Sequence, residues 1–405
     1  MMQSESALLD QAARALDDLR IEIPSWGFAN TGTRFGKFLQ PAAASTIEEK
    51  FSDAAEVHRL TGATPTLALH ALWDLPRGVA DISDIQALER RTGIRAGSIN
   101  PNLFQDQQYK YGSLCNPSEE TRQSALQHVF DSIEIAKRLR CRDISLWLAD
   151  GSNYPGTQSM RKRIEWLQSA LNSAHAHLGP DQRLLVEYKP FEPAFYHTDI
   201  ADWGMSSHLC RAAGPQAYVL VDTGHHYLSQ NIEQIVAWLL HLDLLGGFHF
   251  NDRRYADDDL TLGSIDPYQV FRIFHEICQE IYQDQQTGKS KGPLHAVPFM
   301  IDQSHNLKGK IEATVQTVVT AQELWVKAAL VDREQLAKLQ QSCDLIAAEE
   351  LFRGAFWRDV RPLVAAWREA RDLPADPLKA LRADGYVDRI TRERASRQSA
   401  VSSYA

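Results

Sequence analysis

Cysteine is scarce in this sequence, and the spacing of the few cysteines excludes two structural classes. The 405 residues contain five of them, and no two are separated by the Cys-x-x-Cys spacing. An odd, scattered set does not make a disulfide framework, and the missing paired spacing argues against a structural zinc site built from thiolates. We therefore expect a protein of the reducing cytoplasm.

Long apolar runs are also absent. No stretch is apolar for long enough to span a membrane. The first twenty residues, MMQSESALLDQAARALDDLR, interrupt their apolar stripe with acids and arginines, so they predict an amphipathic helix and not a secretion signal. We expect no membrane partner.

Positive charge is in deficit. The chain has 52 acidic and 43 basic residues, for a formal net charge of -9. Such a surface repels a phosphate backbone unless a basic patch intervenes, and the short run Arg161, Lys162, Arg163 is better explained as a solvated helix face. We expect no nucleic-acid partner.

What the sequence does contain is a repeated alternation of short apolar runs and helical segments. Eight runs predict strands, at 23–27, 64–73, 95–100, 143–150, 183–189, 218–222, 246–250 and 297–302. Helical periodicity fills the intervals, most clearly at 121–139, 160–178, 232–245 and 267–283. Eight strands, each followed by a helix, predict an α/β fold of the closed (β/α)₈ TIM barrel type.

The barrel does not account for the whole chain. We assign residues 1–22 to an N-terminal helix, 23–309 to the barrel and 310–405 to a charged C-terminal helical extension that we expect to make oligomer contacts, with a disordered tail. The first loop, residues 28–45, is longer than usual for a strand-to-helix connection, which is typical of functional or interface loops.

Polar residues gather where the later strands end. The fifth strand ends in VEYKP, the sixth in VDTGHH, the seventh in GFHFND with RRYADDDL after it, and the eighth in MIDQSHN. These motifs supply Glu187, Lys189, Asp222, His225, His249, Asp257, Asp259, Asp302 and Ser304. Because the carboxyl ends of barrel strands surround one site, we expect these side chains to meet.

Several carboxylates with one or two imidazoles and no thiolate suit Mn²⁺, Mg²⁺ or Co²⁺. Crowded carboxylates also need cations to remain ionised together. We predict two neighbouring cation sites, with Glu187 as a candidate bridge. One is held by Glu187, Asp222, His249 and Asp302, and the other by His225, Asp257 and Asp259.

Each motif taken singly has an ordinary structural explanation. A triple-aspartate loop is usually a solvated turn, and VDTGHH can be a core strand with satisfied histidines; only their joint placement at strand ends favours a metal site. His70 and Trp73 end the second strand, and Trp147 lies on the fourth. Indoles are usually core residues, but they also offer a flat apolar face to a polyol. For His70 and Lys189 a structural role and a substrate contact both remain open.

These residues lie in motifs that resemble the L-rhamnose isomerase family in its broad-specificity bacterial form. The resemblance covers nearly the whole chain. It is carried by IPSWGFANTGTRF, HALWD, YKYGSL, DGSNYPGTQ, EYKPFEPAFY, VDTGHH, GGFHFNDRRYADDDL and MIDQSHN, in that order.

The resemblance implies a (β/α)₈ barrel, a homotetramer and two divalent cations, usually Mn²⁺. By resemblance, Glu187, Asp222, His249 and Asp302 hold a structural metal, and Glu187, His225, Asp257 and Asp259 a catalytic one. Residues His70, Trp73, Trp147 and Lys189 would line the sugar pocket, and Phe35 would enter from a neighbouring subunit.

We therefore predict an aldose–ketose isomerase that converts L-rhamnose to L-rhamnulose, with L-mannose, L-lyxose and D-allose as further substrates. Asp302, with Ser304 or a metal-bound water relaying protons, is the candidate acid/base. A hydride shift and an ene-diol route both remain open. The alternative is a ketose 3-epimerase or another metal-dependent sugar enzyme on the same barrel; a phosphodiesterase or nuclease would need a basic groove, and a mere sugar-binding protein would hardly need two cations.

Overall fold

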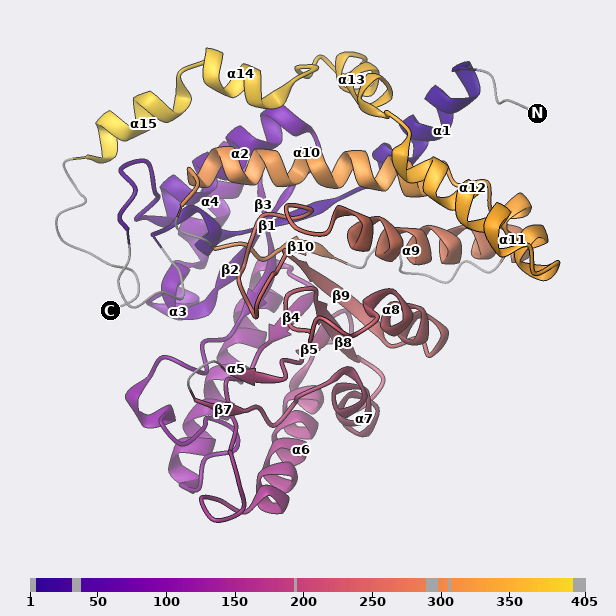
Figure 1. Cartoon of the computed structure of the whole chain (residues 1–405). Coiled ribbons are helices and arrows are strands. Elements are labelled where there is room, and N and C mark those ends of the chain that lie inside the picture. The colour runs from indigo at the N-terminus through magenta and orange to yellow at the C-terminus, as the bar shows by residue number, and fades with distance from the viewer. Residues whose placement is uncertain (1–4, 31–37, 193–194, 289–297, 305–306, 396–405) are drawn as a thin grey trace.

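Eight parallel strands close into a barrel in the computed structural model of this protein (Figure 1). The structure describes residues 5–30, 38–192, 195–288, 298–304 and 307–395. Around the barrel the strands follow the order β1-β10-β9-β8-β5-β4-β3-β2. Their bounds are β1 Ile21–Pro24, β2 Thr66–His70, β3 Arg95–Asn100, β4 Asp143–Leu146, β5 Arg183–Glu187, β8 Ala217–Asp222, β9 Leu245–Phe250 and β10 Phe299–Ile301. The predicted (β/α)₈ fold is confirmed.

Each barrel strand is followed by a helix that covers its outer side (Figure 1). These helices are α2 Ile47–Thr61, α4 Ile82–Thr92, α5 Glu119–Leu139, α6 Met160–His177, α7 Trp203–Ala213, α8 Ile232–His241, α9 Pro267–Thr287 and α10 Lys310–Ala329. Short polar side chains begin several of them: the side chains of Ser118, Asp202 and Asn231 each accept a hydrogen bond from the amide three residues on. Such caps satisfy amides that would otherwise lack a partner.

Both faces of the strands are buried, which explains their nearly continuous apolar runs. All residues of β5, β9 and β10 are buried, because the interior packs on one side and the helices on the other. Core rings such as those of Phe248, Phe250 and Phe299 lie with their centroids 4.6–5.7 Å apart.

Several predicted strands were too long at their carboxyl ends. The first stops at Pro24, because Ser25–Phe28 turn into the 3₁₀ helix η1. The second stops at His70, where Ala71–Asp74 form the short helix α3 and the side chain of Asp74 accepts the His70 amide at 2.7 Å. The fourth and fifth stop at Leu146 and Glu187. An apolar pattern continues past the last ladder hydrogen bond wherever the following loop is also buried.

Helix boundaries differ at two places. The N-terminal helix α1 runs from Glu5 to Asp18, so residues 21 and 22, predicted as part of it, belong to β1. Helix α8 ends at His241, and Leu245, predicted as its last residue, begins β9. In both cases the apolar residues of a strand continue the helical pattern without a break.

Five further helices follow α10: α11 Arg333–Gln341, α12 Leu345–Trp357, α13 Arg361–Glu369, α14 Pro377–Ala383 and α15 Tyr386–Arg394. Helix α10 follows β10 and packs against α9 and α2, while α13 packs against α1, and α14 against α2 and α10 (Figure 1). The division of the chain at residues 22 and 309 stays a prediction. Among the described residues, no helix combines the length and apolarity that crossing a membrane requires.

Candidate active site

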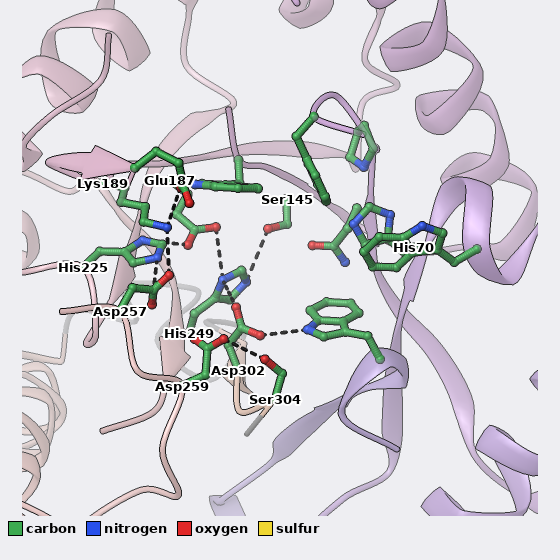
Figure 2. Close-up of a pocket in the computed structure, with 17 residues that line it drawn as sticks. His70, Ser145, Glu187, Lys189, His225, His249, Asp257, Asp259, Asp302 and Ser304 are labelled. Atoms are coloured by element: carbon green, nitrogen blue, oxygen red, sulfur yellow. Dashed lines mark hydrogen bonds and ion pairs between the residues drawn. The ribbon is translucent and has the colours of Figure 1, made fainter. Parts of the chain in front are cut away.

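A cavity of about 210 Å³ opens at the carboxyl ends of the barrel strands (Figure 2). Figure 2 shows carboxylates and histidines gathered on one side of it and His70 on the other. Its lining residues are Trp26, His70, Trp73, Asn100, Pro101, Phe104, Ser145, Trp147, Glu187, Lys189, Glu192, His225, His249, Asp257, Asp259, Asp302 and Ser304. Barrel topology brings these residues together from most of the chain.

The first group of potential metal ligands comes from four adjacent strands. Glu187, Asp222 and His249 end or nearly end β5, β8 and β9, and Asp302 follows β10. One ligand atom from each lies within 4.8 Å of those of the others. The His249 Nδ1 atom is 3.1 Å from Glu187 Oε2, 3.5 Å from Asp302 Oδ2 and 4.0 Å from Asp222 Oδ2. We call these four residues the first cluster.

The second group consists of Asp222, His225 and Asp257 and shares Asp222 with the first. The His225 Nε2 atom lies 3.4 Å from Asp257 Oδ1 and 3.9 Å from Asp222 Oδ2. Glu187 connects the two groups, since its Oε1 atom is 3.1 Å from His225 Nδ1 while Oε2 faces His249. We call Asp222, His225 and Asp257 the second cluster.

Asp259 and Ser304 lie beside the second cluster. Both line the cavity, and the Ser304 hydroxyl donates a hydrogen bond to Asp259 Oδ2 at 2.7 Å. Asp258 faces away, as the alternation along the loop predicts, and its side chain accepts the backbone amides of Arg254 and Tyr255. The loop thus presents its outer two aspartates to the cavity.

Hydrogen bonds decide which oxygen of each carboxylate faces the histidines. Asp222 Oδ1 accepts the Gly224 amide at 2.6 Å and Asn251 Nδ2 at 3.0 Å, which leaves Oδ2 toward the clusters. Asp302 Oδ1 accepts the indole N–H of Trp26 at 2.9 Å, which leaves Oδ2 toward His249. Partners of this kind orient ligands and hold them ready.

The pKa values of the site residues are shifted because several charged groups are buried close together. Burial lowers the pKa of His249, but Glu187, Asp302 and Asp222 outweigh it and raise that pKa to about 9. Burial raises the pKa of Glu187, yet His249 and His225 bring it down to about 2. For Asp222, burial raises the pKa to about 7, with Glu187 adding to the rise and His225 opposing it. Without a metal ion, the negative charge of the carboxylates is therefore balanced by a protonated His249 and by a proton held in part by Asp222. Bound cations could balance the same charge.

The donor set fits a divalent cation. His249 Nδ1 and Asp257 Oδ1 are buried and make no hydrogen bond among the described residues. Buried polar atoms rarely go without a partner, and these two belong to the two clusters. Carboxylate oxygens and imidazole nitrogens without a thiolate match Mn²⁺, Mg²⁺ or Co²⁺. The site can therefore hold metal ions.

A third acidic group, Cys115, Asp150 and Asp199, lies outside the cavity. The fully buried guanidinium of Arg163 approaches Asp199 Oδ2 at 2.7 Å, and Asp150 accepts the amides of Ser113 and Cys115. The guanidinium of Arg163 already balances the negative charge of this group, and its hydrogen bonds connect the surrounding loops.

Aromatic rings form the opposite wall of the cavity. The centroids of His70 and Trp73 lie 3.8 Å apart, and those of Phe104 and Trp147 lie 4.8 Å apart. Burial, together with the charge of Lys50, holds the pKa of His70 well below its usual value, so its imidazole is neutral. His70 Nδ1 and Trp147 Nε1 are buried without a hydrogen-bond partner among the described residues. The wall combines apolar faces with unused polar atoms.

Lys189 lies between two carboxylates at the edge of the aromatic wall. Its Nζ atom is 2.8 Å from Glu192 Oε2, 2.8 Å from Asp257 Oδ2 and 5.2 Å from the centroid of the Trp147 ring. Burial opposes its charge, but Asp257 and Glu192 outweigh burial and raise the pKa of Lys189, so the amine stays protonated. Glu192 comes from a small hairpin of β6 Phe191–Glu192 and β7 Tyr196–His197.

The structure brings nearly all the predicted site residues together. Asp222 lies fully buried behind the cavity lining, whereas Phe35 falls outside the described residues. Sequence reasoning missed Trp26, Phe104, Glu192 and Asn251. Asn251 could have been found, because it lies two residues after His249, directly beyond β9, and side chains two apart along an extended chain point to the same side. The turn that carries Trp26 and the hairpin that carries Glu192 left no pattern in the sequence.

Comparison with known proteins agrees with this architecture. Residues 61–278 match the family described as xylose isomerase-like TIM barrel. A probable sugar isomerase of Rhizobium meliloti is 38% identical over 384 residues, which cover 92% of this chain and 86% of the relative. A second, from Mesorhizobium japonicum, is 37% identical over 400 residues, covering 95% and 90%.

Among solved structures, the 3-keto-D-glucoside 4-epimerase of E. coli superposes with a TM-score of 0.51. The match covers 76% of this chain and 99% of the epimerase at 14% identity, a likeness of fold alone. The family match spans more than half of the chain, and the two rhizobial relatives extend the similarity over nearly all of it. The chain belongs to the xylose isomerase-like TIM barrel family.

Proposed function

We propose that this protein is a metal-dependent aldose–ketose isomerase that converts L-rhamnose to L-rhamnulose, accepts related sugars and uses two divalent cations, with Mn²⁺ preferred. The observation that carries the proposal is the pair of adjoining clusters that share Asp222 and are connected by Glu187, facing an aromatic wall. The names of the two rhizobial relatives, both probable sugar isomerases, support the reaction class.

The reaction moves one hydrogen between C1 and C2 and one proton between the two oxygens. Bound cations would supply Lewis acidity toward those neighbouring oxygens. Two clusters side by side suit two neighbouring oxygens, because each oxygen can then be stabilised separately. A single cluster would leave one oxygen to hydrogen bonds alone.

The chain's own groups have separate tasks in this proposal. Asp302, whose orientation is fixed by Trp26, and Ser304, which lines the same cavity, exchange the proton between the sugar oxygens. Lys189 keeps its charge and donates a hydrogen bond to a substrate oxygen at the cavity edge. The rings of Trp73, Phe104 and Trp147 cover the carbon skeleton and exclude water.

A ketose 3-epimerase is the nearest rival, since epimerases share this fold. Such an enzyme inverts C3 and has no use for a second cluster. The experiment that separates the two is product analysis by ¹³C NMR after incubation with Mn²⁺ and either L-rhamnose or L-rhamnulose. We expect each sugar to yield the other. A new ketose, epimeric at C3 and without any aldose, would replace the proposal with epimerisation.

A further inference from the structure

The buried guanidinium of Arg253 binds main-chain carbonyl groups instead of a carboxylate. The residue is 5% exposed, and among the described residues its guanidinium forms no salt bridge with a carboxylate. Its Nε atom donates to the carbonyl of His226 at 2.7 Å, Nη1 to that of Thr223 at 3.1 Å and Nη2 to that of Tyr227 at 3.1 Å. Nη1 also donates to Gln269 Oε1 at 3.2 Å.

These three carbonyls belong to residues 223–227 of the loop between β8 and α8, where the Thr223 amide still donates to the carbonyl of His249 on β9 at 3.0 Å and the later residues lie beyond the strand. His225 lies at its centre, with Arg253 bound to the carbonyl before it and to two after it. Arg253 itself lies in the loop after β9, so this strand-to-helix loop holds the preceding one, after β8. The backbone on both sides of His225 is thus hydrogen-bonded to a buried guanidinium.

The ring of His225 depends on that backbone. Its Nδ1 atom is 3.1 Å from the carbonyl oxygen of Tyr188, and Nε2 then points to Asp222 and Asp257. The residues of the first cluster, by contrast, lie on or directly after barrel strands, where the sheet fixes their backbone. Like Asp257, His225 lies on a loop beyond its strand, and Arg253 is the buried group that binds the loop of His225.

We propose that Arg253 is a positioning residue that holds His225 in the second cluster and so sets the metal affinity of that cluster, but not of the first. The proposal rests on the two-cation function proposed above. Arginine suits the task because its planar fork reaches several carbonyls at once, whereas a lysine amine cannot span three.

Titration of metal-free protein with Mn²⁺, followed by electron paramagnetic resonance of the free ion, tests this without any sugar. The variants are Arg253→Lys and Arg253→Gln, with hydrogen exchange of residues 223–227 measured in parallel. We expect the wild type to bind two ions. In the variants the first ion should bind normally and the second about 10- to 100-fold more weakly, as for other residues that support a metal ligand, with faster exchange in the loop.

Arg272→Gln is the matched control, because Arg272 lies on α9 and its guanidinium pairs with a carboxylate, that of Glu233 on α8 at 2.7 Å, instead of binding the carbonyls of residues 223–227. It should bind both ions normally. The proposal would be overturned if both Arg253 variants bound the second ion with unchanged affinity, or if both ions were weakened equally. It would also be overturned by a wild type that binds fewer than two ions, or by variants that no longer fold without metal. A wild type that binds two ions yet leaves L-rhamnose unchanged would refute only the proposed isomerase, and the titration would still decide the role of Arg253.

Discussion

Glu187 and Asp222 each lie close to both histidines of the clusters, so these two carboxylates connect the clusters. Each oxygen of Glu187 faces a different histidine, and Asp222 Oδ2 lies about equally far from both histidines, at 3.9 and 4.0 Å. Two clusters built on shared carboxylates must respond together when a shared residue changes. Residues that belong to one cluster, such as His225 and Asp302, can be tested separately.

The first prediction for a single residue is the effect of Asp302→Asn on turnover. The amide keeps the shape and the contact with Trp26, so the fold should persist, but it cannot accept the proton that the reaction moves. We expect kcat to fall by about 10²- to 10⁴-fold, the usual contribution of an acid/base group. Steady-state kinetics with L-rhamnose at saturating Mn²⁺, together with a melting curve, measure both effects.

The control for this variant is Asp181→Asn, an exposed residue just before β5, at the opposite end of that strand from Glu187. It should turn over normally. Near-normal kcat in Asp302→Asn would remove Asp302 from the chemistry, whatever its place in the first cluster.

The candidate ligands were predictable because they lie at the ends of barrel strands or in the loops directly after them, and the strands could be recognised in the sequence. Their supporting partners were not. Trp26 reaches Asp302 across 276 positions of sequence, and Glu192 reaches Lys189 from a two-residue strand. Side-chain hydrogen bonds between loops leave no periodic pattern, so only the folded chain reveals them.

Among the secondary-structure elements, the eight strands were predicted correctly; the third matches β3 at both ends, whereas the first, second, fourth and fifth were extended too far at their carboxyl ends. The 3₁₀ helix η1, Ser25–Phe28, is as buried as the strand β1 that precedes it, so hydrophobicity alone cannot mark the end of the strand. The order of the C-terminal helices was likewise beyond prediction. Helix α15 returns to α2, more than 300 positions earlier in the chain, through a contact between charged residues.

That contact gives a prediction for stability. Arg394 on α15 donates to both oxygens of the buried Asp53 on α2, at 2.9 and 2.8 Å, and Tyr386 donates to the same carboxylate at 2.8 Å. Removing Asp53 leaves the buried Arg394 without its hydrogen-bonded carboxylate, and the Glu49 carboxylate, 3.6 Å from Arg394 Nε, is the more distant partner that remains. Asp53→Ala should therefore lower the free energy of unfolding by about 3–5 kcal/mol.

Urea unfolding followed by circular dichroism measures this loss. Asp388→Ala serves as the comparison, because Asp388 lies exposed on α15 itself. It should change stability by no more than about 0.5 kcal/mol. If Asp53→Ala and Asp388→Ala have the same free energy of unfolding, the contact between α2 and α15 stabilises the fold no more than an exposed residue does.

For the whole molecule, the expected homotetramer stays a prediction. We propose that the contacts between its subunits lie on the C-terminal helices. On α12, Leu345, Ile346 and Trp357 are each more than 70% exposed. Large apolar side chains in such numbers often mark contacts with other chains. Sedimentation velocity should report four chains for the wild type and smaller species for Trp357→Glu. A monomer at micromolar concentration in the wild type would contradict the tetramer.

We propose that two adjoining clusters make this barrel a metal-dependent aldose–ketose isomerase. Its most direct test is the conversion of L-rhamnose by EDTA-stripped protein, measured before and after addition of Mn²⁺, with Glu187→Gln treated identically because Glu187 connects the clusters. We expect no conversion by the stripped protein, restored formation of L-rhamnulose by the wild type once Mn²⁺ is added, and little or none by the variant. Full conversion without metal, or none with both ions bound, would contradict it.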